Sequence, residues 1–156
     1  AVHTLTHPNL TEQTEEEIIR QVEEDRKNLE ALVGYPIRCM AYPCGGVNND
    51  ERVAKLIKEH TGVKYARTIK SSNSLELQDN LYQFNPTIYH LSFEQAFKLG
   101  QQLIDAKPEK PMILYLWGHG YEFDLEDAWE RFEEFCEFIS GHDDIFYGTN
   151  RDVFGI

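Results

Sequence analysis

The amino-acid sequence predicts one α/β domain over residues 1–156, with a parallel sheet covered by helices. Apolar runs of strand length alternate with amphipathic stretches along the whole chain, and this order favours parallel strands joined by helices. The 156 residues suffice for one hydrophobic core and are too few for two. An open doubly wound sheet and a barrel both fit this pattern, and in both the active-site residues lie at the carboxyl ends of the strands.

The first half of the chain is expected to contain two helices and two strands. Residues 14–33 place apolar side chains on one side at helical spacing, and Gly34 is suited to end that helix. The short apolar run 39–43 precedes a glycine-containing loop and predicts a buried strand. A second helix is expected at 50–60 and a second strand at 63–69.

The second half is expected to continue the alternation. Ser92, with Gln95 three residues later, has the pattern of a helix start, and Asp124 is expected to begin the last helix. The predicted elements are a loop at 70–80, extended chain at 83–89, helices at 92–106 and 124–139, and strands at 111–117 and 144–149.

The composition excludes several classes of partner. The chain has 15 Lys and Arg against 27 Asp and Glu, and its net charge of -12 repels phosphate backbones and anionic membrane surfaces. We therefore expect no nucleic-acid partner, and no apolar run is long enough for membrane insertion. Cys39, Cys44 and Cys136 are an odd number and are interpreted as free thiols.

Two histidines near the start of the chain form a candidate metal site. His3 and His7 are four residues apart, so one turn of chain can aim both rings at a common point. Zinc accepts such a pair at about 2.0–2.1 Å per nitrogen. The spacing alone leaves a second interpretation open, in which both are exposed loop histidines.

A third histidine is a candidate proton donor. His119 follows the apolar run that ends at Trp117, between two glycines, and imidazole titrates near neutrality. The alternative is a structural histidine that is hydrogen-bonded in a turn. Glu122 could orient His119, face a substrate, or only favour a helix dipole.

Four segments together resemble the polysaccharide deacetylases of the NodB-homology group, carbohydrate esterase family four. The first resembles the family's histidine motif H-[ST]-x-x-H-P, the second its A-Y-P-x-G motif, the third its arginine-bearing strand and the fourth its late L-x-H motif. In order along the chain they are H-T-L-T-H-P at 3–8, A-Y-P-C-G-G at 41–46, Y-A-R-T at 65–68 and W-G-H at 117–119.

The resemblance implies an incomplete or distorted (β/α) barrel whose N-terminal strands are missing from this chain. The chain would then hold the C-terminal majority of the domain. The family's opening motif, T-F-D-D-G, supplies the base and the third metal ligand, and we expect it upstream of His3 in the full protein. Self-association is expected to cover the sheet edge left open by the missing strands.

The resemblance also assigns roles to the candidate residues. His3 and His7 become the metal ligands, His119 the catalytic acid, and Arg67 the substitute for an arginine that many relatives carry at the position of Ala41. The backbone N–H of Cys44 would help to hold the oxyanion, while its thiol would be either a metal ligand or a small buried packing group. The remaining candidates for contact with the substrate are Tyr42, Pro43, Trp117 and Glu122, with His90 as a supporting group; Tyr42 and Trp117 could stack on sugar rings or belong to the core.

The function implied is metal-dependent removal of N- or O-linked acetyl groups from a carbohydrate polymer or oligosaccharide. The metal would be divalent, with zinc as first choice and cobalt or nickel as alternatives. Two other interpretations stay open: a metal-dependent amidohydrolase acting on a small non-sugar amide, and a catalytically inactive glycan-binding domain, suggested by the absent aspartates.

Overall fold

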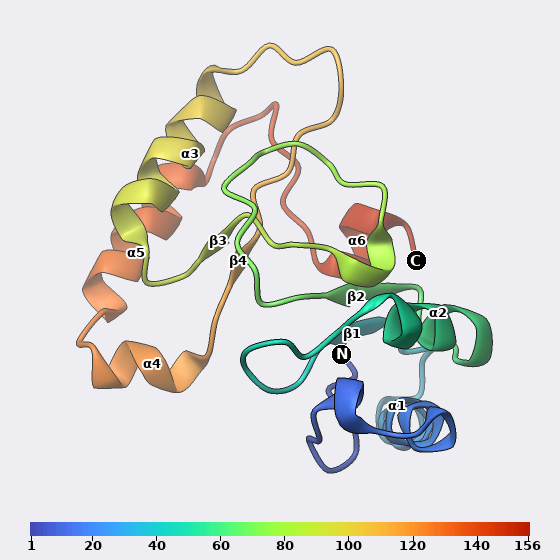
Figure 1. Ribbon diagram of the computed structural model, residues 1–156. Coiled ribbons are helices and arrows are strands. Elements are labelled where there is room, and N and C mark those ends of the chain that lie inside the picture. The colour runs from blue at the N-terminus through green and yellow to red at the C-terminus, as the bar shows by residue number, and fades with distance from the viewer. The chain divides into compact units, whose positions relative to one another are not determined.

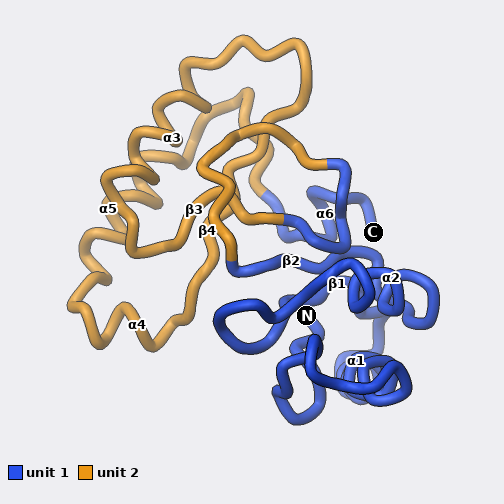
Figure 2. Tube along the Cα trace, in the orientation of Figure 1, with its two compact units in different colours: residues 1–69, 79–84, 148–156 blue, residues 70–78, 85–147 orange.

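The computed structural model describes residues 1–156 and divides into two compact units (Figure 2). Unit 1 comprises Ala1–Ile69, Asp79–Phe84 and Gly148–Ile156, and unit 2 comprises Lys70–Gln78 and Asn85–Tyr147. Short parallel strands alternate with helices along the chain, as an α/β class requires (Figure 1). None of the helices has the length and apolar character that crossing a membrane requires.

Unit 1 is built on a small parallel sheet. Strand β1 (Cys39–Ala41) pairs in parallel with β2 (Tyr65–Arg67), and Ala41 lies opposite Arg67. Val2 forms a parallel bridge to Met40 on one side of this pair, and Arg67 forms one to Phe84 on the other. The carboxyl ends of these neighbouring segments therefore lie at one edge, where the sequence places its polar candidates.

Unit 1 has two capped helices: one precedes β1, and the other connects β1 to β2. Helix α1 (Glu15–Val33) begins at Thr14, whose side chain accepts the N–H of the third helical residue, and ends at Gly34 with a left-handed φ of 76°. Helix α2 (Glu51–His60) begins at Asp50, which caps it in the same way. The predictions for 14–33 and 50–60 are thus confirmed.

Three short elements complete unit 1: the 3-10 helices η1 (Leu10–Glu12) and η2 (Leu81–Gln83), and helix α6 (Asn150–Phe154). The sequence did not predict α6. The side chain of Thr149 caps it by accepting a backbone N–H.

The predicted strand at 144–149 is wrong. The N–H of Ile145 bonds to the carbonyl of His142 at 3.1 Å and closes a turn at the start of this segment, and the segment pairs with no strand. Its last residue, Thr149, has become a helix cap.

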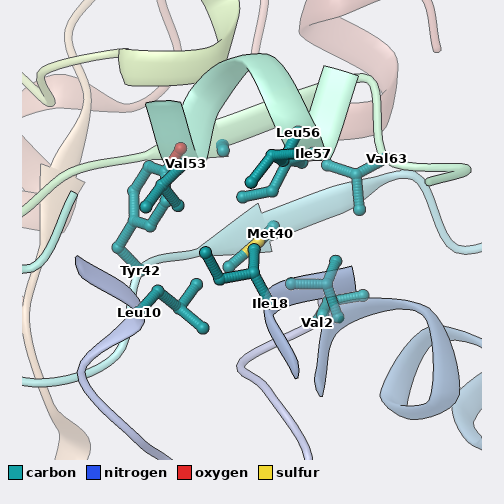
Figure 3. Close-up of a cluster of buried hydrophobic side chains, with 11 residues drawn as sticks. Val2, Leu10, Ile18, Met40, Tyr42, Val53, Leu56, Ile57 and Val63 are labelled. Carbon is teal, nitrogen blue, oxygen red and sulfur yellow. The ribbon is translucent and has the colours of Figure 1, made fainter. Parts of the chain in front are cut away.

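The core of unit 1 joins α1, α2 and the sheet. Figure 3 shows Leu10 and Ile18 close to Met40, with Val53 and Ile57 of α2 beyond. Burial of such apolar side chains is the main stabilising term of a fold of this size. The fully or almost fully buried members are Val2, Leu10, Ile18, Val22, Met40, Tyr42, Val53, Leu56, Ile57, Val63 and Ala66.

Truncation of Leu10 is expected to destabilise unit 1 strongly. Its side chain is 0% exposed, so Leu10→Ala should leave a cavity and lower the free energy of unfolding by about 2–5 kcal/mol. Leu32→Ala is the matched control, because Leu32 is 81% exposed and its truncation should change that free energy by no more than about 0.5 kcal/mol. Urea unfolding measures both; equal midpoints for the two variants would contradict this core.

Unit 2 has its own parallel pair of strands. Strand β3 (Ile88–Tyr89) pairs with β4 (Leu116–Trp117). Helix α3 (Phe93–Asp105) packs against α5 (Trp129–Ile139), and the short helix α4 (Gly120–Leu125) follows β4 directly (Figure 1). Ser92 precedes α3 as predicted, but its side chain makes no capping hydrogen bond.

Two predictions for unit 2 need correction. The strand expected at 111–117 is reduced to two residues, because the chain before it pairs with the preceding loop: Met112 forms an antiparallel bridge to Glu76. The helix expected at 124–139 is two helices. Asp124 lies inside α4, and its carboxylate accepts the indole N–H of Trp129 at 2.7 Å instead of capping a helix.

The sheets do not form a closed barrel. Two two-stranded parallel sheets are present, one in each unit. The α/β class and the parallel pairing are confirmed, whereas barrel closure is not seen.

Candidate functional site

The histidine segment begins at the carboxyl edge of the unit 1 sheet. Val2 bridges to Met40, so His3 emerges beside the end of β1. The Nδ1 of His3 lies 2.9 Å from the carbonyl oxygen of Ala41. Because a carbonyl only accepts, Nδ1 must carry the proton, and in the neutral ring Nε2 has the lone pair that a metal needs.

His3 and His7 lie close together, as their spacing predicted. Their ring centroids are 4.9 Å apart and the ring planes meet at 70°. Two imidazoles that bind one tetrahedral ion at about 2.0–2.1 Å have centroids about 5 Å apart. The pair therefore fits two ligand positions of one ion.

Cys44 supports His7. Its thiol donates to the backbone carbonyl of His7 at 3.4 Å, and Sγ lies 3.7 Å from the Nδ1 of His7. Cys44 is half-buried, so it is not the fully buried packing residue that was one of its two interpretations. All three cysteines are free thiols, as predicted.

The backbone at this place is strained. Thr4, His7 and Cys44 have positive φ values of 68°, 59° and 66°. Such conformations cost non-glycine residues about 1–3 kcal/mol each and are concentrated at functional sites. The buried side chain of Gln21 holds the segment by both accepting from the N–H and donating to the hydroxyl of Thr6.

A buried side chain holds the loop after β1 in place. Asn48 is fully buried, and its amide donates to the carbonyls of Pro43 and Cys44 at 2.9 and 2.8 Å. Tyr42 is 1% exposed and donates to the carbonyl of Tyr82. Its ring is therefore a core side chain and not a stacking surface; burial raises the pKa of its hydroxyl well above the ordinary value.

Arg67 stands at the end of β2, and β1 lies between it and the histidine segment in the sheet. It lies opposite Ala41, whose carbonyl oxygen receives His3. Its guanidinium donates to the carbonyl of Thr68 at 3.2 Å. The sheet thus brings Arg67 to the same edge as His3.

The metal donor set of this site has two members. No group of three or more His, Cys, Asp or Glu side chains in the structure could hold a metal ion. His3 and His7 fit an ion as a pair, and further ligands have to come from elsewhere, such as water, substrate or an additional carboxylate.

Unit 2 gathers a second group of polar side chains at the carboxyl ends of β3 and β4. Glu122 Oε2 lies 2.8 Å from His90 Nε2 and 3.1 Å from His119 Nδ1, and it accepts the backbone N–H of His119 at 3.0 Å. His90 is buried, whereas half of the His119 side chain is exposed. Trp117 is half-buried and its ring contacts that of Tyr89.

Glu122 is ionised in this arrangement. Desolvation raises the pKa of Glu122, but hydrogen bonds from Tyr89, from the backbone and ring of His119, and from His90 lower it to about 2. A carboxylate only accepts, so the Nδ1 of His119 carries a proton, and in the neutral ring Nε2 is the nitrogen left to take up a proton. Desolvation, together with the bond to Glu122, raises the pKa of Tyr89 to about 12.

The contacts of Glu122 predict a pH dependence of stability. Its pKa falls from the ordinary 4.5 to about 2 on folding, so its contribution is complete above pH 4.5 and is lost as the pH falls towards 2. The difference in free energy of unfolding between the wild type and Glu122→Gln should therefore be largest above 4.5 and shrink below it. Urea titrations across this window measure it, and a constant difference would contradict the assignment.

Sequence reasoning missed the residues that hold the site in place. Gln21 was interpreted as part of an amphipathic helix, and Asn48 as part of a loop. Neither has a sequence signal, because only the fold shows that these polar side chains are buried. Tyr89 was interpreted only as extended chain, although its position beside His90 offered a hint.

Comparison with known proteins agrees with the geometry of unit 1. Residues 1–66 match the sequence model of the polysaccharide deacetylase family. The match covers 66 of the 156 residues; it supports a polysaccharide deacetylase family domain over this part of the chain and agrees with the resemblance for the segments at 3–8 and 41–46. The match indicates a hydrolase that deacetylates carbohydrates, and this family generally uses a divalent metal. No curated protein and no solved structure matches the chain.

Proposed function

We propose that the protein is a metal-dependent deacetylase that removes N- or O-linked acetyl groups from an oligosaccharide or polysaccharide. The observation that carries this proposal is the paired imidazoles of His3 and His7 inside the segment that matches the family. Two imidazoles at the spacing of adjacent metal ligands are a rare coincidence in a loop whose backbone is also strained.

His3 and His7 would hold the metal, with zinc as first choice and cobalt or nickel as alternatives. A metal held there would supply Lewis-acid chemistry, polarising the acetyl carbonyl and lowering the pKa of the attacking water. The bond from His3 Nδ1 to the carbonyl of Ala41 fixes which nitrogen faces the ion. Cys44 restrains His7, because its thiol donates a hydrogen bond to the backbone carbonyl of His7.

The remaining steps fall to groups that donate hydrogen bonds or protons. The backbone N–H of Cys44 makes no hydrogen bond within the protein and is the group we assign to the oxyanion. Arg67 supplies positive charge at the same edge. The proton that the attacking water gives up would pass to Nε2 of His119, which is oriented by Glu122 and returns that proton to the departing amine or hydroxyl. Pro43 and Trp117 are assigned to substrate contact.

Acetate release by the full-length protein tests the proposal. The enzyme loaded with zinc is incubated with chitin-type oligomers, with O-acetylated xylan oligomers and with small cyclic amides, and released acetate and opened amide are measured. Release of acetate from either glycan supports the proposal. Turnover of the cyclic amides alone would assign a small-amide hydrolase, and glycan binding without turnover or bound metal would assign an inactive glycan-binding domain.

A further inference from the structure

His90 is the most deeply buried ionisable side chain of unit 2, and its ring is closely packed. It is 4% exposed, its backbone N–H donates to the carbonyl of Trp117 at 2.8 Å, and its ring packs edge-on against Phe123 and Tyr89 at centroid distances of 4.4 and 4.7 Å. A Cβ atom on Gly118 would lie only 2.1 Å from the His90 ring. The ring therefore fills the space that a side chain at position 118 would need.

This fixed ring points one nitrogen at the carboxylate of Glu122. The distance from Nε2 to Oε2 is 2.8 Å, and because an ionised carboxylate has no proton to give, Nε2 is the donor. The same oxygen receives the backbone N–H and the Nδ1 of His119. Glu122 is in the first turn of the six-residue helix Gly120–Leu125, and these hydrogen bonds orient its carboxylate.

We propose that His90 is a positioning residue: it holds Glu122 in the rotamer that fixes the Nδ1–H tautomer of His119, so that His119 presents Nε2 for proton transfer. The buried histidine thus acts on His119 only through the carboxylate between them. This inference rests on the proposed function for its catalytic consequence, but the tautomer of His119 can be measured without any turnover.

Two pairs of variants separate this role from a merely structural one. His90→Leu removes the donor, whereas His90→Gln keeps an amide N–H near the position of Nε2. Gly118→Ala forces the ring of His90 to shift while leaving the residue at position 90 unchanged, because its Cβ would lie within 2.3 Å of the ring's Cδ2 and Nε2. Gly120→Ala is its matched control, because a Cβ there meets nothing within 4 Å. His142→Leu, in the same unit, controls for the loss of a histidine.

The primary measurement is ¹⁵N NMR of the neutral imidazole of His119 in the full chain, assigned with His119→Ala. We expect the Nδ1–H tautomer in the wild type, His90→Gln, Gly120→Ala and His142→Leu, and a mixture with Nε2–H in His90→Leu and Gly118→Ala. If His90→Leu does not fold, His90→Asn, whose shorter amide does not reach Glu122, takes its place. An unchanged tautomer in Gly118→Ala and in the His90 variants that lack the donor would overturn the proposal.

Acetate release then tests the consequence. kcat should fall by about tenfold or more in His90→Leu and Gly118→Ala with KM nearly constant, and His90→Gln should stay within about threefold of the wild type. A wild type without activity would count against the proposed deacetylase and would leave the tautomer result standing. A changed tautomer with unchanged kcat would overturn the catalytic part of the inference.

Discussion

Replacement of His3 by alanine is expected to abolish both metal binding and acetate release in the full-length protein. The variant loses one imidazole of the pair. His7 cannot supply a second metal ligand in its place, because its Nδ1 faces Cys44. A catalytic metal supplies several kcal/mol to the transition state. Since about 1.4 kcal/mol corresponds to tenfold in rate, kcat/KM should fall by at least about 10³-fold. Elemental analysis and acetate release on the same preparation measure both effects.

Helix α2 offers a clean control for this experiment. His60 is an exposed residue at the end of α2, and His60→Ala should keep both metal and activity. His3→Ala loses one exposed hydrogen bond, about 0.5–1.5 kcal/mol, so the variant is expected to fold. His7→Ala should behave like His3→Ala. A stoichiometric metal in either variant would show that the ion is bound elsewhere.

Local signals predicted α1 and α2 well because residues next to each helix end determine where it begins and ends. Thr14 and Asp50 cap α1 and α2, and Gly34 ends α1 in the left-handed conformation. The C-terminal region was predicted poorly for the opposite reason. An apolar run such as 144–149 becomes a strand only if a partner strand is beside it, and here a turn at His142 and the cap at Thr149 use the backbone groups instead.

The candidate site was predicted where spacing along the chain determines it. His3 and His7 lie close together as their four-residue spacing suggested, and Glu122 contacts His119 three residues away, as one of its interpretations held. What the sequence could not show is burial. The core position of Tyr42 and the contact of His90 with Glu122 depend on segments 40 and 32 residues apart in the chain.

Removal of the proposed acid, in His119→Ala, should have the second largest effect on activity. A positioned general acid is worth about 10² to 10⁴-fold, so kcat for an N-acetylated oligosaccharide should fall by that factor while KM changes little. The carboxylate of Glu122 keeps His90 and the backbone N–H of residue 119 as partners, so α4 is expected to persist. Steady-state acetate release measures the loss, with His142→Ala as the histidine control in the same unit.

Comparing substrates with different leaving groups shows whether the loss of activity in His119→Ala reflects loss of proton donation. An amine departs from carbon only when it gains a proton, whereas a nitrophenolate departs without one. His119→Ala should therefore retain most of its activity towards 4-nitrophenyl acetate and lose it towards the N-acetylated sugar. Because the two substrates share the same acetyl carbonyl, damage to the metal or the oxyanion site would lower both rates equally. Equal loss on both substrates would thus remove His119 from the role of acid and assign it to binding of the acetyl group.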